Sequence, residues 1–172
     1  MRLLICGLLT FVFVQMLLYA RSPDSVVDMW LVTLNSAGQI HIGMTADALV
    51  KTTGEEGSTL VDMKLEGTFS PSILVSYKDK KTLVAADVRT DEKNQWVVTR
   101  LTIYDSRFHT DSGIHIGSTY SDVKAKYPHS KIISGEGSEA LFDTKAGISF
   151  ILTSERLVQN ATVERMIVVA SH

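Results

Sequence analysis

A short motif that occurs twice in the chain constrains its fold more than any other feature. Residues 40–45 read Ile-His-Ile-Gly-Met-Thr and residues 114–119 read Ile-His-Ile-Gly-Ser-Thr, 74 positions apart (114 minus 40). In an extended segment the two isoleucines point to one side and the histidine to the other. The glycine permits a tight turn, and the threonine is a favourable helix N-cap. Each copy therefore predicts a short strand, a turn and then a helix.

Each copy of the motif is followed by residues with helical spacing. The first helix is predicted over residues 45–53, with Gly54 just past its C-terminus. In the second helix Thr119 and Asp122 form a capping-box pair, and Pro128 ends the helix. The apolar stripes consist of Ala46, Leu49 and Val50 in the first helix and of Tyr120, Val123 and Tyr127 in the second. The shared identity and spacing favour an internal duplication over a chance similarity.

The segments after each helix alternate between apolar and polar residues with the period of β-strands. This alternation predicts strands over residues 60–66, 73–77, 82–88, 96–104, 131–133, 140–142, 147–153 and 162–170. Short polar turns join consecutive strands, which favours antiparallel pairing. We therefore predict an α+β protein with antiparallel sheets and two short helices, built as a tandem strand-turn-helix-strands repeat and preceded by an N-terminal apolar helix.

The repeat also sets the predicted boundaries within the chain. Residues 39–112 form the first α+β repeat and residues 113–172 the second. Residues 22–38 are too apolar for a free linker, so they are either a stalk or a first strand. The polar connection over residues 105–112 is expected to be ordered, because it carries Phe108.

The N-terminal segment predicts export. Residues 3–20 carry no charged side chain, with Arg2 before them and Arg21 after them. About 20 apolar residues suffice to cross a bilayer as a helix. Residues 1–21 are therefore either a signal peptide or a membrane anchor, and the sequence leaves both open. Because short basic ends tend to stay in the cytoplasm, the rest is predicted to be periplasmic, or anchored in the inner membrane and facing the periplasm.

The composition argues against several classes of function. Cys6 is the only cysteine, so the exported part has no disulfide and no cysteine metal site. With 17 Lys and Arg against 19 Asp and Glu, and no basic cluster, nothing points to a nucleic-acid partner. The chain contains neither a Gly-x-Ser-x-Gly nucleophile elbow nor a phosphate-binding loop. We predict no catalytic residues and no cofactor.

Histidines and aromatic residues are the candidate site residues in this sequence. His41 and His115 occupy the same position of the motif and lack a second ligand at useful spacing, so we interpret them as outward-facing strand residues and not as metal ligands. One aromatic and basic surface is a candidate binding site, formed by Tyr104, Arg107, Phe108, His109 and Tyr120. The competing interpretation is that the aromatic rings pack in the core and that His109 lies in a solvated connection.

Residues 97–123 resemble a known family. The segment Val-Thr-Arg-Leu-Thr-Ile-Tyr-Asp-Ser over residues 98–106, followed by Thr-Asp-Ser-Gly-Ile-His-Ile-Gly-Ser-Thr-Tyr-Ser-Asp-Val over residues 110–123, is similar to the core of a small family of sigma-E-regulated envelope lipoproteins of unknown function. The resemblance implies a protein of the bacterial envelope. It does not imply lipid anchoring, because no cysteine is placed for lipidation.

More loosely, the duplicated motif resembles the repeats of beta-lactamase-inhibitor and outer-membrane small-lipoprotein folds. In those folds a helical element packs on an antiparallel sheet and the proteins bind other proteins. We therefore predict a non-enzymatic, exported bacterial envelope protein that binds a partner protein or an envelope component. The alternative is a periplasmic or secreted small-ligand binder or enzyme inhibitor, with a cleft between the repeats.

Overall fold

The fold is taken from a computed structural model of the chain. It describes residues 28–54, 57–65, 68–76, 81–135, 138–143, 145–153 and 160–169. The apolar helix predicted over residues 3–20 lies outside the described residues. Within the described ranges, no helix has the length and apolar character that a membrane crossing requires.

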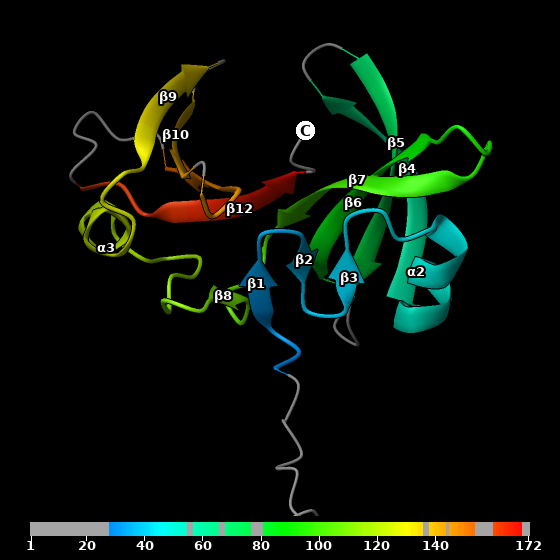
Figure 1. The fold of residues 1–172 in the computed structure, drawn as a ribbon, viewed down its shortest axis with the longest axis horizontal. Helices are drawn as coiled ribbons and strands as arrows, with labels where there is room; N and C mark the ends of the chain where they lie inside the picture. Colours follow the sequence, from blue (N-terminus) through cyan, green and yellow to red (C-terminus); the bar gives the residue numbers. More distant parts are fainter. Residues whose placement is uncertain are drawn as a thin grey trace, which may run out of the picture.

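The main sheet has eight antiparallel strands in the order β4-β5-β6-β7-β12-β11-β10-β9 (Figure 1). One half of it consists of β4 (Ser58–Leu65), β5 (Thr68–Ser76), β6 (Thr82–Thr90) and β7 (Trp96–Ile103). The other half consists of β9 (Lys131–Gly135), β10 (Ser138–Asp143), β11 (Ile148–Leu152) and β12 (Val163–Val169). The alternation of apolar and polar residues predicted all eight strands. β5 begins earlier than predicted, because Thr68 already pairs with Leu65 of β4.

A smaller sheet of four short strands has the order β3-β2-β1-β8. Its members are β1 (Leu31–Thr33), β2 (Ser36–Ala37), β3 (Ile40–His41) and β8 (His109–Thr110). β1 and β8 run parallel, so this small sheet is mixed, while the main sheet is antiparallel as predicted. A parallel pair needs a long connection, and most of the first half of the chain lies between these two strands.

Two short helices complete the α+β fold, as predicted. α2 (Ala46–Thr53) begins after Thr45, whose side chain accepts a hydrogen bond from the backbone N–H of Ala48. α3 (Tyr120–Lys126) begins after Thr119, which forms a reciprocal capping box with Asp122. Hydrogen bonds from Thr119, above all from its hydroxyl, hold the pKa of the Asp122 carboxyl below its usual range. Both helix starts therefore lie where the sequence predicted them.

Equivalent backbone hydrogen bonds in the two halves join the start of each helix to the last strand of its half of the main sheet. The N–H of Gly43 donates to the carbonyl of Val98, and the N–H of Val98 donates to Met44, both at 2.8 Å. In the second half the N–H of Gly117 donates to Val163 at 2.8 Å, and the N–H of Val163 donates to Ser118 at 2.9 Å. In both halves the motif turns at its glycine, with φ +83° at Gly43 and +94° at Gly117. The turn and the helix of the two copies thus follow one plan, whereas the short strand predicted at residues 114–116 is not formed, and His115 makes an isolated bridge with His109.

The two halves meet at the pairing of β7 with β12, in the middle of the main sheet (Figure 1). Val98 and Val163 are equivalent, because each exchanges two backbone hydrogen bonds with the turn before the helix of its half, and they are 65 positions apart (163 minus 98). By that offset Thr102 corresponds to Ile167, and these two residues lie directly opposite each other. A local twofold axis therefore passes between them, and α2 and α3 lie at opposite ends of the molecule.

One hydrophobic core runs through both halves and the small sheet. Its fully buried side chains include Leu49 of α2, Val123 of α3 and Phe150 of β11. In the motif, Ile40 and Ile114 are buried while His41 and His115 are exposed, as the alternation predicted. Ile42 and Ile116 are only partly buried at the edge of this core.

Candidate functional site

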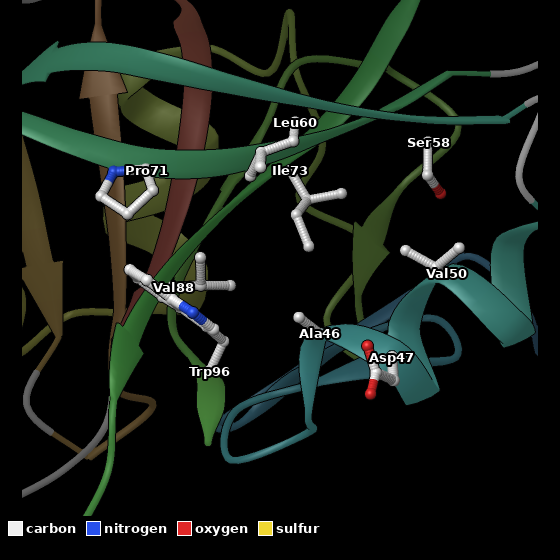
Figure 2. A pocket seen from close by; sticks show the side chains of 9 residues that line it. All are labelled: Ala46, Asp47, Val50, Ser58, Leu60, Pro71, Ile73, Val88 and Trp96. Carbon is white, nitrogen blue, oxygen red and sulfur yellow. The ribbon is translucent and has the colours of Figure 1, made fainter. Parts of the chain in front are cut away.

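A pocket of about 510 Å³ lies between α2 and the first half of the main sheet (Figure 2). Most of the side chains that line it are apolar, and they come from α2 and from all four strands of this half. They are Ala46, Asp47, Val50, Ser58, Leu60, Pro71, Ile73, Val88 and Trp96. Leu60 is 69% exposed and Trp96 is 48% exposed, so two large apolar side chains stand at the solvent side of the pocket.

One residue of the pocket lining, Ala46, is small where the other half has an aromatic side chain. When the two helices are aligned on their capping threonines, Ala46 corresponds to Tyr120 and Thr53 corresponds to Tyr127, each 74 positions apart (120 minus 46 and 127 minus 53). Tyr120 packs against the core and Tyr127 is buried in it. The second helix therefore fills the space above its sheet with two rings that the first helix lacks.

The strands beneath the helices show the same contrast. Ala86 of β6 pairs with Leu101, and Phe150 of β11 pairs with Met166. Leu101 and Met166 are equivalent at the offset of 65 (166 minus 101), so Ala86 stands where the second half has Phe150. The Phe150 ring contacts the Tyr127 ring, with centroids 5.1 Å apart. Ala86 is itself fully buried and does not line the pocket, so this contrast concerns the core of the two halves.

Trp96 is held at the rim by the turn between β6 and β7. Asp91 accepts hydrogen bonds at its carboxylate from the backbone N–H groups of Lys93 and Gln95, at 2.9 and 2.8 Å. Asn94 takes a positive φ of 60°, a conformation that asparagine tolerates better than most residues. This turn leads directly into the strand, where Trp96 pairs with Thr90. The indole is thus placed by the backbone and remains half exposed.

A second, more polar hollow of about 250 Å³ adjoins the pocket. It is lined by Thr45, Ala46, Asp47, Asn94, Gln95 and Trp96. Ala46, Asp47 and Trp96 line both spaces, so the apolar pocket and the polar hollow adjoin at these three residues. At the other end of α2, the hydroxyls of Thr53 and Ser58 are hydrogen-bonded and link the helix to β4.

Three of the predicted site residues lie together in a different place. Arg107, Phe108 and His109 gather around Trp30, beside the small sheet. The Trp30 and Phe108 rings meet edge to face with centroids 5.0 Å apart, and the Arg107 guanidinium lies 4.4 Å from the centroid of Trp30. Arg107 also donates two hydrogen bonds to the Asp105 carboxylate, at 2.8 and 3.1 Å. The hydrogen bond from the Arg107 side chain is the main reason why the pKa of Asp105 is lowered.

His109 bridges this cluster to the start of the described chain. Its Nδ1 lies 3.0 Å from the carbonyl oxygen of Arg107, and its Nε2 lies 3.1 Å from the carboxylate of Asp28. A neutral imidazole can donate to only one of these two acceptors, whereas an imidazolium donates to both. Phe108 is buried, so the ring predicted for a binding surface belongs to the core. The cluster therefore fastens the chain at residue 28 to the small sheet.

The remaining two predicted site residues are placed by other contacts. Tyr104 follows β7, and its N–H donates to the carbonyl of Leu83 at 2.9 Å. Tyr120 lies on α3 and packs against the core. The structure thus brings together three of the five predicted residues and uses Phe108 and Tyr120 for packing. The pocket was not predicted from the sequence, because its lining comes from α2 and four strands, and the small residue Ala46 stands out only when the two halves are aligned.

The described residues contain no group of three or more His, Cys, Asp or Glu side chains that could hold a metal ion. His41 and His115 are both exposed. The Nδ1 of His115 lies 2.8 Å from the carbonyl oxygen of Ile116, which is a local contact within the turn.

Comparison with known proteins identifies a related fold. No protein-family model matches the chain, and no curated protein matches it. The fold is similar to the crystal structure of the uncharacterized protein YfeY from Escherichia coli, with a TM-score of 0.56 and 13% sequence identity. The similarity covers 82% of this chain and 97% of that chain. At this identity it shows the fold alone, and the resemblance to envelope lipoproteins stays a prediction.

Proposed function

We propose that the protein is a non-enzymatic binding protein that takes an apolar ligand into the pocket between α2 and the first half of the main sheet. The observation that carries this proposal is the open, mostly apolar pocket itself, whose lining residue Ala46 stands where the second half has Tyr120. Hydrophobic burial favours closure of such a space by about 25 cal/mol per Å². A ligand that fills the open pocket would therefore gain this free energy of apolar burial.

The size and lining of the pocket support a small ligand. Its volume of about 510 Å³ lies within the range of roughly 300–1,000 Å³ that is usual for small-molecule sites. Such sites are mostly apolar and carry a few polar groups that set orientation. Here Val50, Ile73 and Val88 supply apolar wall, while Asp47 and Ser58 supply polar groups. The ligand would bury an apolar body against these side chains.

The pockets described lie within the first half, not at the junction of the halves. β7 and β12 are joined there by a continuous ladder of paired residues. The predicted cleft between the repeats is therefore replaced in this proposal by the space under α2. We also propose that the ligand is bound outside the cytoplasm. The reason is the uncharged segment over residues 3–20, which is typical of a signal peptide or a membrane anchor.

A partner protein is the second candidate, and one observation favours it. β9 is an edge strand of the main sheet, and its Ile132 and Ile133 are 47% and 52% exposed. Edge strands with exposed apolar residues can accept a further strand from another protein. A protein partner would then bind in the second half, away from the pocket.

Tryptophan fluorescence tests the first candidate. The chain has two tryptophans, so Trp30→Phe leaves Trp96 at the rim as the only reporter. Octyl glucoside, an uncharged chain below its micelle concentration, should change the emission of Trp96 in a saturable way. Ala46→Tyr copies the residue of the second half into the pocket and should abolish that change. Ala125→Tyr, the same substitution at an exposed position of α3, should leave it intact.

The proposal fails if octyl glucoside produces no saturable change in the parent. It also fails if Ala46→Tyr and Ala125→Tyr bind the probe equally well. Loss of binding in an Ile133→Ser variant, with the pocket variants unaffected, would favour the edge strand as the binding surface.

A further inference from the structure

The side chains that line the pocket and the hollow carry a negative charge and no positive one. Among the residues that line the apolar pocket and the adjoining polar hollow, Asp47 is the only charged one. It is exposed and belongs to the lining of both spaces. No lysine or arginine lines either space, so no cation in these linings balances the carboxylate.

Trp96 shares this position between the two spaces. Its indole lines both of them and is 48% exposed, which leaves aromatic surface open to a ligand. Figure 2 shows Trp96 and Asp47 on the same side of the pocket, with Ala46 between α2 and the indole. A carboxylate beside an aromatic face is a favourable environment for an ammonium or guanidinium group, because both attract positive charge.

The second half lacks both features. Aligned on the capping threonines, Asp47 corresponds to Ser121, 74 positions later (121 minus 47). By the offset of 65 between the central strands, Trp96 corresponds to Ala161, which is buried (161 minus 96). The half that keeps an open pocket is therefore also the half that carries the carboxylate and the exposed indole.

We propose that the ligand is a small cationic amphiphile, an inference that rests on the proposed function of the pocket. Its apolar chain lies among Val50, Ile73 and Val88, and its cationic head lies in the polar hollow between Asp47 and Trp96. The side-chain amides of Asn94 and Gln95, which line the hollow, can accept hydrogen bonds from an ammonium group. An anionic head in the same place would face the Asp47 carboxylate and be disfavoured.

Asp47 also has an ordinary structural role that the test must separate from binding. It lies in the first turn of α2, where a negative charge stabilises the helix. That role affects the stability of the folded chain, but it does not make the chain distinguish between ligands of different charge. The informative quantity is therefore the ratio of two affinities, measured on one variant.

Three probes with the same chain and different heads provide that ratio. Octyltrimethylammonium, octyl glucoside and octyl sulfate are titrated into the Trp30→Phe protein below their micelle concentrations, with binding measured by calorimetry. We expect the cationic probe to bind about tenfold more tightly than the uncharged one, from one exposed charge pair and one cation–π contact. The anionic probe should bind more weakly than either.

Variants then assign the preference to its residues. In Asp47→Asn the ratio of cationic to uncharged affinity should fall clearly, to the part that Trp96 supplies, and Trp96→Leu should reduce it as well. Glu164→Gln removes an exposed carboxylate from β12 and should leave the ratio unchanged. Raising the salt concentration should lower the ratio in the parent protein, since exposed charges are screened.

The outcomes separate this inference from the proposed function. Equal binding of the three probes in the parent overturns the inference and leaves an apolar pocket. A preference that is undiminished in Asp47→Asn also overturns it, because the charge would then act from elsewhere. Absence of binding by all three probes overturns both the inference and the proposed function.

Discussion

Truncation of Phe150 to alanine should open a cavity in the core of the second half. Phe150 is fully buried on β11, at the position that Ala86 occupies in the first half. Truncating a buried phenylalanine to alanine costs about 3–5 kcal/mol of folding free energy, because the lost transfer energy and the cavity both contribute. Domains have a total stability of about 5–15 kcal/mol, so Phe150→Ala should still fold with clearly reduced stability.

Part of this cost comes from the contact with Tyr127. The two rings are tilted with centroids 5.1 Å apart, and such aromatic pairs contribute about 0.5–1.5 kcal/mol beyond the area they bury. Tyr127→Ala and the double variant complete a cycle that isolates this coupling energy. We expect a positive coupling, because removal of either ring leaves the other beside a void.

Equilibrium urea unfolding followed by circular dichroism measures all four proteins. Ile133→Ala is the control, since that side chain is 52% exposed and its truncation should change stability by less than about 1 kcal/mol. A Phe150→Ala protein that unfolds within about 1 kcal/mol of the parent would refute the reasoning. The second half would then not depend on this ring for its packing, and the contrast with the open pocket would lose its basis.

Three smaller perturbations test the helix starts and the Arg107 cluster. Thr119→Ala should cost about 1 kcal/mol in urea unfolding, because it removes the cap of α3. Gly117→Val should cost about 1–3 kcal/mol from backbone strain alone, since φ is +94° and a Cβ there would meet no atom within 4 Å; an unchanged midpoint would mean that the turn relaxes freely. Arg107→Gln should cost at most about 1 kcal/mol at neutral pH. The hydrogen bond lowers the pKa of Asp105 in the folded chain below 3.8, so this contribution is present above that pH and lost as the pH falls through the lowered value. A difference between parent and Arg107→Gln that grows on acidification would contradict the assigned contact.

The elements of the fold could be predicted because their signals are local. The glycine and threonine of each motif set the turn and the cap, and Gly117 and Thr119 adopt those roles in the structure. Alternation of apolar residues located the strands, since one face of each must be buried. The parallel pairing of β1 with β8 has no such signal. It joins Leu31 to His109, and no short-range pattern relates residues so far apart in the chain.

The candidate site was harder to predict for a related physical reason. A binding pocket is a deficit of volume, and volume is shared by residues from several elements. Ala46 and Ala86 look like ordinary helix and strand residues, and only their three-dimensional positions show that a ring is missing at each. The aromatic and basic residues near the second motif were easier to notice. Three of them do cluster, but Arg107 and His109 are engaged by Asp105 and Asp28.

The similarity of the two halves explains how the chain can maintain an open pocket. An unfilled space lowers stability, because its lining lacks contacts on one side. In this fold the sheet is continuous across β7 and β12, so the closed half and the open half share one core. The packing of Tyr127 on Phe150 can therefore stabilise a sheet whose other half borders the pocket. Stability is often given up at functional sites, and the difference between the halves is one reason why we propose the space under α2 as the binding site.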